Sequence, residues 1–283
     1  MKRLALASIQ PPNVAGKSAD ANAHMIDRGF EFLQEALEKG VAFACLPEFF
    51  NVFGLGPDMP KGADNYLEVL AKARGLASRF RSHLVIALLV PEDGSYRDRA
   101  YLIGDDGEIM GHYDKIHPTL GEKEQLGIAP GGEIAVFETR HGRVAIVICY
   151  DIYFPELFAR LSKLAPEVIF LPSLQRSEHE MASEAIVKAR AMDTQAYLVR
   201  SSYGSETATP WQAGMMFGQS CVVHPDGTVL ANAGHYEGFA MAHVPVPFAW
   251  QRQRCGGYPT QPVREFLRED RRPEVYRQDE RQA

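Results

Sequence analysis

The sequence predicts an α/β protein whose mixed sheets carry helices on their outer faces. Strand-like apolar runs alternate along the chain with stretches of helical periodicity, which is typical of crossover connections between parallel strands. Asp-Gly pairs at Asp106-Gly107 and Asp226-Gly227 lie between apolar runs and indicate hairpins, which require antiparallel strands. The chain has 283 residues, of which 46% are hydrophobic. That is enough to bury one large core, so a single domain over residues 1–283 is expected.

The first half of the chain predicts five strands and two helices. A helix over residues 18–39, which Ser18 or Asp20 can cap and Gly40 can end, lies between the first two strands. A second helix is expected over residues 64–81. The strands are expected at residues 4–10, 41–46, 83–90, 100–103 and 108–113.

The second half continues the alternation of strands and helices. Strands are expected at 143–148, 168–171 and 196–201, and helices from Pro155 and over about 178–193. Proline suits the first turn of a helix because its missing N–H has no partner there in any case.

The last segment, residues 251–283, is rich in charges of both signs. It still contains apolar side chains at Val263, Phe266, Leu267, Val275 and Tyr276. We therefore expect it to pack on the domain or on a partner subunit, apart from a solvated end.

Composition excludes several classes of protein. The net charge of −6 and the lack of a basic stripe argue against nucleic-acid binding. No apolar run is long enough to span a bilayer, and the N-terminus has no hydrophobic signal core, so a cytoplasmic protein without membrane contact is expected.

Neither the cysteines nor the His179-Glu180 pair has the spacing of a metal site. Cys45, Cys149, Cys221 and Cys255 lack zinc-site spacing. Cys45 and Cys221 lie in strand-like runs and are interpreted as packing residues, whereas Cys255 lies in a Gly-rich loop and is expected to be exposed. His179-Glu180 has no second histidine at helical spacing, so no metal site is predicted.

Cys149 ends an apolar run a few residues before Pro155, which predicts a thiol at a strand-to-helix turn. Such a turn holds a nucleophile firmly, and the N–H of Tyr150 is available for a developing oxyanion. An inert buried thiol is an equally good interpretation of this motif alone.

Two further charged residues follow strand-like runs and favour the catalytic interpretation. Glu48 comes after residues 41–46, beside aromatic side chains that tend to raise the pKa of a carboxyl group, and Lys115 comes after residues 108–113. Together with Cys149 they supply a base, an oxyanion clamp and a nucleophile. A cysteine–histidine mechanism would need His117 as base, but we favour a role for His117 in shaping the Lys115 loop. Asp151 and Glu156 are interpreted as acids that fix the cysteine turn.

These motifs resemble the nitrilase superfamily of carbon-nitrogen hydrolases. Pro47-Glu48-Phe49, Tyr113-Asp114-Lys115-Ile116-His117 and Cys149-Tyr150-Asp151 are similar, in order and separation, to the glutamate, lysine and cysteine motifs of that family. The resemblance covers nearly the whole chain. It implies a four-layer αββα sandwich, a homodimer or higher homo-oligomer, and no metal or organic cofactor.

The resemblance also implies a second glutamate between the lysine and the cysteine. Glu124 fits it better than Glu122, because of its distance from the Pro130-Gly131 turn. The implied reaction is hydrolysis of a small amide through a thioester on Cys149. Adjacency in sequence adds pocket walls at Phe49, Phe50, Tyr150, Tyr153, Ser173 and Leu174.

Departures from family patterns bear on the substrate. Nitrile-cleaving members have Trp-Glu after the cysteine, whereas this chain has Tyr150-Asp151, similar to the amidase and carbamoylase branches. Carbamoylases acting on D-amino acids grip a carboxylate through arginines and a histidine, at places that Ile152, Tyr153 and Glu122 occupy here. We therefore expect a small neutral or cationic linear amide, although Arg176 could reach a carboxylate from another direction. The alternatives are an N-carbamoyl amine or amino acid substrate, acyl transfer to an amine or lipid, and a non-catalytic metabolite-binding protein.

Overall fold

A computed structural model describes residues 2–14, 16–174, 180–207, 209–210, 218–248 and 250–276. The chain divides into two compact units, Met1–Val246 and Pro247–Ala283. The larger unit contains every residue predicted to act in catalysis. No helix among the described residues has both the length and the apolar character needed to cross a bilayer.

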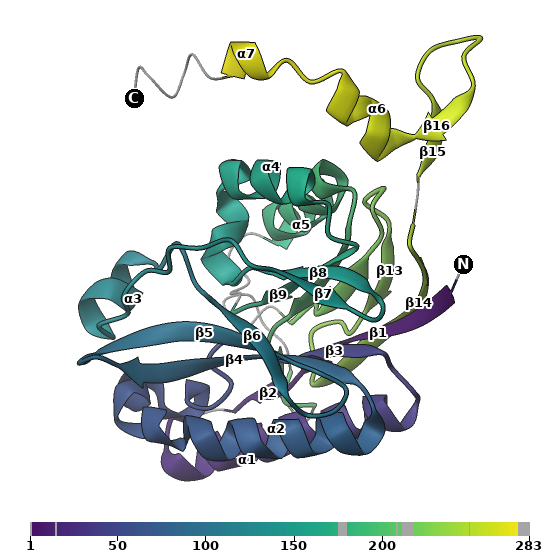
Figure 1. Cartoon of the computed structure of the whole chain (residues 1–283). Helices are drawn as coiled ribbons and strands as arrows, with labels where there is room; N and C mark the ends of the chain where they lie inside the picture. Colours follow the sequence, from purple (N-terminus) through teal and green to yellow (C-terminus); the bar gives the residue numbers. More distant parts are fainter. Residues whose placement is uncertain are drawn as a thin grey trace. The chain divides into compact units, whose positions relative to one another are not determined.

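Two six-stranded sheets form the centre of the larger unit (Figure 1). In spatial order, the first contains β14 (Gly238–Val246), β1 (Lys2–Gln10), β3 (Phe43–Cys45), β4 (His83–Glu92), β5 (Ser95–Ile103) and β6 (Ile109–Asp114). The second contains β13 (Val229–Asn232), β12 (Cys221–Val223), β10 (Tyr197–Ser201), β9 (Val168–Pro172), β8 (Gly142–Ile146) and β7 (Val136–Thr139). The pairs β1–β3, β3–β4, β8–β9 and β9–β10 are parallel, and the other neighbours are antiparallel. Both sheets are therefore mixed, as the sequence predicts.

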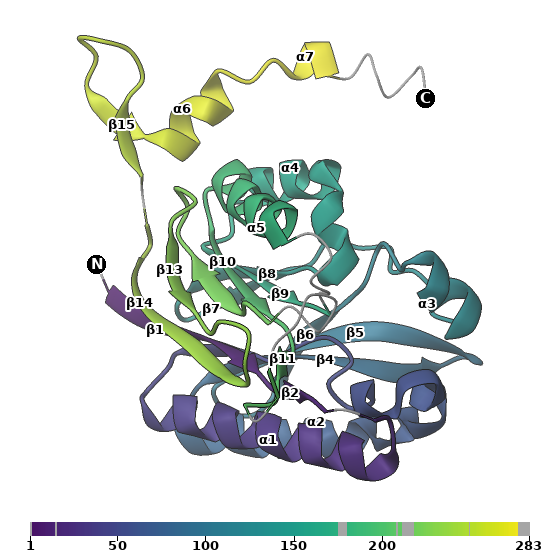
Figure 2. The same cartoon turned by 180° about the vertical axis from the view of Figure 1, so that it is seen from behind.

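The two sheets face each other, and helices cover their outer faces (Figures 1 and 2). α1 (Ala19–Glu38) and α2 (Tyr66–Phe80) pack on the first sheet, while α4 (Pro155–Leu164) and α5 (Glu180–Thr194) pack on the second. The sheets meet through direct contacts: the Phe43 and Phe170 rings lie 5.5 Å apart, and the Ser8 hydroxyl donates to the carbonyl of Arg200. The expected four-layer αββα sandwich is confirmed.

Local sequence explains where these helices begin and end. The Ser18 hydroxyl accepts from the N–H of Ala21 at 3.1 Å and caps α1, and Gly40 follows the helix in the left-handed conformation at φ 77°. Pro155 is the first residue of α4, as predicted.

Several elements differ from the prediction. The second helix begins at Tyr66, because Pro57, Pro60 and the left-handed Gly56 (φ 58°) confine the preceding residues to the 3₁₀ segment η1 (Phe53–Asn65). The strands β7 and β14 were not predicted from the sequence. The short pair β2 (Pro12–Asn13) and β11 (Gly204–Ser205) and the helix α3 (Leu120–Gln125) were also missed.

The smaller unit has its own hairpin and helices. β15 (Gln251–Gln253) pairs antiparallel with β16 (Thr260–Pro262), and α6 (Val263–Glu269) and α7 (Pro273–Tyr276) follow. Val263 and Phe266 are buried, while Leu267 is 53% exposed. That this segment packs on the domain or on a partner subunit stays a prediction.

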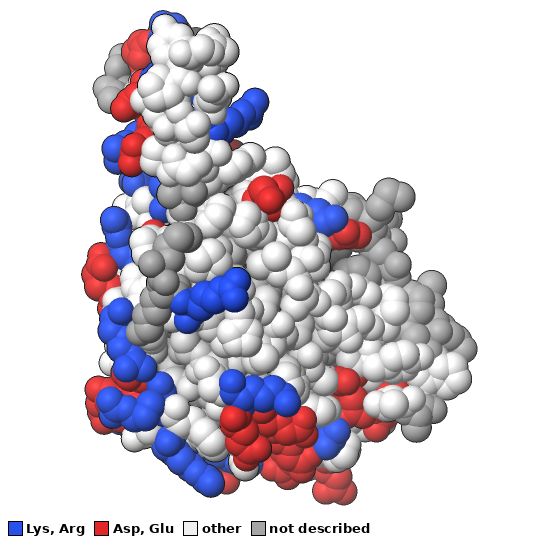
Figure 3. All heavy atoms as spheres, turned by 90° about the vertical axis from the view of Figure 1, so that its right-hand side faces the viewer, with Lys and Arg blue, Asp and Glu red and all other residues white. Residues whose placement is uncertain are grey.

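The distribution of charge accords with the composition. Figure 3 shows Lys and Arg side chains interspersed with Asp and Glu on the face it displays.

Candidate active site

Cys149 lies at the turn that the sequence predicts. It follows β8 and opens the 3₁₀ segment η2 (Cys149–Tyr153), which leads directly into α4. Its backbone has φ 40°, a left-handed conformation rare for a residue with a side chain. Such strain is found where the surrounding structure fixes the backbone firmly. The side chain is nearly enclosed, and Sγ lies 3.7 Å from the carbonyl oxygen of Leu174.

The buried carboxylate of Asp151 fixes this turn. Its Oδ2 accepts from the Tyr113 hydroxyl at 2.7 Å and from the N–H of Ile148 at 3.0 Å. Its Oδ1 accepts from the N–H of His117 at 3.0 Å and lies 2.8 Å from Nδ1 of the same residue. The His117 ring also stacks on Phe154 at 3.6 Å. Asp151 and His117 therefore join the cysteine turn to the Lys115 loop, in the structural roles that the sequence predicts. Glu156 is exposed, so the structure does not support the role in fixing this turn that the sequence predicts for it.

Glu48 lies beyond the end of β3, in a loop held by buried polar side chains. Asn51 accepts from the N–H of Leu89 at 2.9 Å and donates to its carbonyl at 3.1 Å. The Tyr203 hydroxyl donates to the main-chain oxygen of Glu48 at 2.9 Å. The Glu48 side chain is fully buried. A residue just after β10 of the second sheet thus supports the loop that follows β3 of the first.

Lys115 binds two carboxylates. Its Nζ donates to Oε1 of Glu48 at 2.5 Å and to Oε1 and Oε2 of Glu122 at 2.7 and 2.8 Å. Burial alone would lower the pKa of Lys115, but Glu48 and the other negative groups around the ammonium outweigh burial and raise that pKa well above its usual value. Lys115 is therefore a permanent cation at the site.

The preference for Glu124 is wrong, because Glu122 is the glutamate that lies against Lys115. Glu122 is the third residue of a capping box: its Oε2 accepts from the N–H of Thr119 at 2.8 Å, and Thr119 caps α3. Glu124 is exposed. Two residues along a helix are rotated by about 200°, so only one of these glutamates can face Lys115. Burial and the charge of Glu48 raise the pKa of Glu122.

A third carboxyl group lies at Lys115, and the sequence analysis missed it. Oδ2 of Asp98, on β5, lies 3.3 Å from Nζ of Lys115. Oxygens of Glu48, Asp98 and Glu122 all lie within 4.8 Å of one another. Three clustered carboxyl groups can hold a metal ion, but here each contacts the Lys115 ammonium, which fills the place a cation would take.

These charges act directly on the thiol. Burial and the negative charge of Glu48 raise the pKa of Cys149 well above its usual value, although Lys115 opposes them. The free thiol is therefore neutral near pH 7. A base is needed to remove its proton during attack, and Glu48 is close enough for its charge to affect the thiol.

The residues predicted to line the pocket fall into two groups. Tyr150 and Tyr153 are 38% and 50% exposed, and their rings lie 5.5 Å apart beside the cysteine turn. Phe49 and Ser173 are buried, and Nζ of Lys115 lies 5.8 Å from the centre of the Phe49 ring. Leu174 is partly buried. Phe50 and Leu174 pack in two different apolar clusters. The cluster of Phe50 is formed by the first sheet and its helices. Arg176 and His179 lie outside the described residues.

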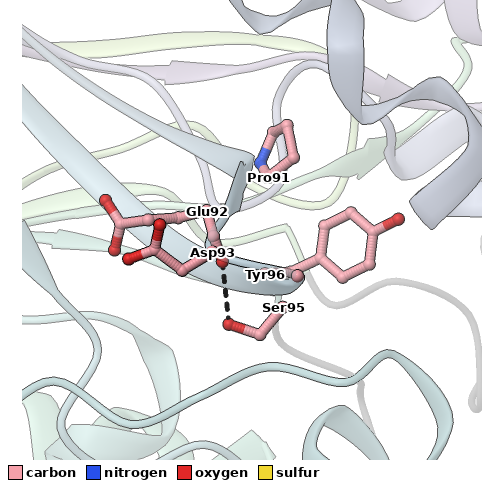
Figure 4. Close-up of a pocket in the computed structure, with 6 residues that line it drawn as sticks. Pro91, Glu92, Asp93, Ser95 and Tyr96 are labelled. Carbon is pink, nitrogen blue, oxygen red and sulfur yellow. Dashed lines mark hydrogen bonds between the residues drawn. The ribbon is translucent and has the colours of Figure 1, made fainter.

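A separate hollow occurs at the β4–β5 turn (Figure 4). It is lined by Pro91, Glu92, Asp93, Gly94, Ser95 and Tyr96, and none of the predicted catalytic residues borders it. Figure 4 shows the Ser95 hydroxyl donating to the carbonyl of Glu92, at 3.0 Å. This hollow is formed by the hairpin and is distinct from the candidate active site.

Three of the cysteine predictions are confirmed. Cys45 and Cys221 are buried in β3 and β12, and Cys255 is exposed. Burial raises the pKa of Cys45 well above its usual value. Neither buried strand cysteine lies at a strand-to-helix turn.

The chain is similar to known proteins in family, sequence and structure. The family model described as carbon-nitrogen hydrolase matches residues 5–249. The chain is 27% identical over 259 residues to the omega-amidase NIT2 of Homo sapiens, covering 86% of this chain and 88% of that protein. It is 27% identical over 221 residues to the deaminated glutathione amidase of Dictyostelium discoideum, covering 71% and 75% respectively. An amidase crystal structure from Nesterenkonia sp. superposes with a TM-score of 0.77 at 21% identity, covering 97% of this chain and 95% of that one.

Proposed function

The chain belongs to the carbon-nitrogen hydrolase family of the nitrilase superfamily, and we propose that it hydrolyses a small linear amide through a thioester on Cys149. One observation carries the proposal: Lys115 is held between Glu48 and Glu122, and the charges of all three residues act on the Cys149 thiol. Groups suited to act as nucleophile, base and oxyanion clamp thus lie in one buried site, which supports the proposal. The amidases among the relatives support the same reaction class.

The proposed reaction begins with attack of Sγ on the amide carbon. Glu48 takes the thiol proton as the C–S bond forms, so no free thiolate has to exist in the buried site. The carbonyl oxygen becomes an oxyanion, which Lys115 and the N–H of Tyr150 stabilise. If one N–H of Lys115 is shared between both oxygens of Glu122, another is left for the substrate oxygen. Glu122 thereby fixes the direction of the clamp.

Breakdown of this intermediate releases the nitrogen. Glu48 returns its proton to the nitrogen as the C–N bond breaks, so ammonia or an amine departs and a thioester remains. Water then attacks the thioester carbon while Glu48 removes a proton from it. The C–S bond breaks, Glu48 returns that proton to sulfur, and a carboxylic acid leaves. Protons balance over the cycle, and the residues at the site suffice for each step.

Among amides, we propose a neutral or cationic substrate. Ile152 and Tyr153 stand where arginines would grip a carboxylate in carbamoylases acting on D-amino acids. With Glu122 as the second glutamate, the position two residues earlier is Leu120, which is 65% exposed and is also not the histidine of those enzymes. The exposed Tyr150 and Tyr153 offer an aromatic entrance instead of a bidentate anion anchor.

The test is ammonia release from a panel containing a neutral amide, its nitrile, an N-carbamoyl amine and an N-carbamoyl amino acid. Hydroxylamine is added to intercept the thioester as a hydroxamate. We expect the highest kcat/KM for the neutral amide, and hydroxamate formation that Cys149→Ala abolishes. Preference for the nitrile or a carbamoyl compound would overturn the substrate assignment. Turnover without a trappable intermediate would overturn the mechanism.

A further inference from the structure

Asp98 is a buried carboxyl group that the reaction above does not use. It lies on β5, where its main-chain oxygen accepts from the N–H of Lys115 at 2.9 Å, and its side chain is fully buried. Oδ2 lies 3.3 Å from Nζ of Lys115, but neither carboxyl oxygen accepts a hydrogen bond within the described part of the chain. A buried polar group without a partner is costly, so this arrangement needs an explanation.

The neighbouring carboxylates are better supplied with donors. Glu122 accepts from Lys115 through both oxygens and from the N–H of Thr119. Glu48 accepts from Lys115 through Oε1, while its Oε2, like both carboxyl oxygens of Asp98, has no hydrogen-bond partner among the described residues. Asp98 and Glu48 therefore present two adjacent acceptors with no donor between them.

One proton on Asp98 removes this conflict. An ionised carboxylate only accepts hydrogen bonds, whereas a neutral carboxylic acid donates one. Asp98 is the best of the three to hold the proton, since Lys115 stabilises the other two as anions. Burial and the charge of Glu48 raise the pKa of Asp98 well above its usual value, with Lys115 opposing.

The charged groups around Asp98 agree with this assignment. Glu48, Lys115 and Glu122 face it from the loop after β3, the loop after β6 and α3. The adjacent Arg99 is engaged elsewhere, with Asp114 at 2.6 and 2.9 Å and with Glu92 at 2.8 Å. Arg97 pairs with Glu92 at 3.0 Å. Within the described part of the chain, Lys115 is thus the one cation in contact with the three carboxyl groups of Glu48, Asp98 and Glu122.

We propose that Asp98 is a positioning residue: a neutral carboxylic acid that donates its O–H to Oε2 of Glu48 and so holds the base as an oriented anion beside Cys149. This inference rests on the proposed amidase function. With Asp98 neutral, the site contains one ammonium and two carboxylates, and no third negative charge repels the oxyanion as it forms. When Glu48 accepts the thiol proton through its other oxygen, the Asp98 hydrogen bond keeps the carboxyl group from rotating.

Urea unfolding as a function of pH tests the protonation state without any substrate. A carboxyl group whose pKa is raised in the folded protein makes its full contribution to the free energy of unfolding below its unfolded pKa of about 4. As pH rises from there towards the folded pKa, that contribution is lost and the protein becomes less stable. Asp98→Asn is neutral at every pH, so its urea midpoint relative to the wild type should rise between pH 4 and pH 8. Asp114→Asn is the matched control on the next strand: it removes the partner of Arg99 and should lower the midpoint at pH 8. A midpoint for Asp98→Asn that instead falls increasingly with pH would overturn the proposal, because it would mean that Asp98 is an anion paired with Lys115.

Infrared spectroscopy of protein carrying ¹³C-labelled aspartate gives a direct reading. We expect a protonated-carboxyl band at pH 7 that shifts with the label and is missing in Asp98→Asn. Absence of that band from the wild type would overturn the proposal even if the variant failed to fold.

Kinetics then test the positioning role. Removing an oriented hydrogen bond at a catalytic centre costs about a hundredfold, so Asp98→Ala should lose that much in kcat with little change in KM. Asp98→Asn keeps a donor and should recover turnover to within about tenfold of the wild type. Equal losses in the two variants would overturn the role of the donor. If the wild type hydrolyses no amide, the proposed function fails, while unfolding and infrared data still decide whether Asp98 holds the proton.

Discussion

Replacing Asp151 by asparagine should destabilise the protein although the two side chains have nearly the same shape. The carboxylate accepts from the N–H of Ile148 and the hydroxyl of Tyr113 on one oxygen, and its other oxygen faces the main-chain N–H and the ring Nδ1 of His117. An amide has one oxygen and one NH₂ group, which can only donate. In either orientation one main-chain N–H, that of Ile148 or of His117, loses its acceptor.

The expected loss in the free energy of unfolding follows from the hydrogen bonds that the substitution removes or weakens. An unsatisfied buried donor costs about 1–3 kcal/mol, and losing the charge weakens the remaining hydrogen bonds by about 1 kcal/mol in all. We therefore expect Asp151→Asn to lower the free energy of unfolding by about 2–4 kcal/mol. The hydroxyl of Tyr113 can turn to accept from the amide, which favours loss of the Ile148 bond.

Urea unfolding followed by circular dichroism measures this loss as a lower midpoint with an unchanged slope. Glu156→Gln is the matched control: Glu156 is exposed in the same helix-start region, and its change should stay within about 0.5 kcal/mol. Tyr113→Phe, alone and combined with Asp151→Asn, tests the coupling between the two side chains. A loss below about 1 kcal/mol for Asp151→Asn would refute the view that this carboxylate fixes the cysteine turn.

Three other substitutions test the site. Cys149→Ala should abolish ammonia release while Cys255→Ala leaves it intact; comparable turnover in both would exclude Cys149 as the nucleophile. Glu122→Gln should reduce kcat by about a hundred- to a thousandfold, because Lys115 loses the anion that directs it. Glu124→Gln should alter kcat less than about twofold, since substitution of an exposed side chain away from the site rarely has a large effect. A larger loss for Glu124→Gln than for Glu122→Gln would restore Glu124 as the second glutamate. Tyr203→Phe should lower the free energy of unfolding by about 1–2 kcal/mol, because the main-chain oxygen of Glu48 loses its donor, and an unchanged urea midpoint would count against that hydrogen bond.

Local patterns along the chain were enough to predict three of the residues that the structure brings together. Glu48, Lys115 and Cys149 each follow an apolar strand-like run, and a strand that ends at a turn places the next polar side chain at the edge of its sheet. The alternation of strands and helices likewise predicts mixed sheets with outer helices, since each element must bury its apolar side. The prediction that the two sheets stack on each other came from the family resemblance. Periodicity shows that one face of a strand or helix is buried, but it does not show which element covers that face.

The choice between Glu122 and Glu124 required the tertiary structure. Both are acidic and both lie in the same short helix, so composition and spacing from the Pro-Gly turn cannot separate them. The rotation of α3 about its axis decides which one meets Lys115, and the Thr119 cap fixes that rotation.

Asp98 shows the same limit of sequence reasoning. In Tyr96-Arg97-Asp98-Arg99 it resembles a solvated charge in a hairpin strand. Strand alternation turns it away from both arginines, and pairing of β5 with β6 brings it under Lys115. The sequence by itself determined which chemical groups are available and which strands present them. Only the folded chain decided which carboxyl groups share one ammonium, because charges far apart in sequence affect one another's protonation only once burial and proximity bring them together.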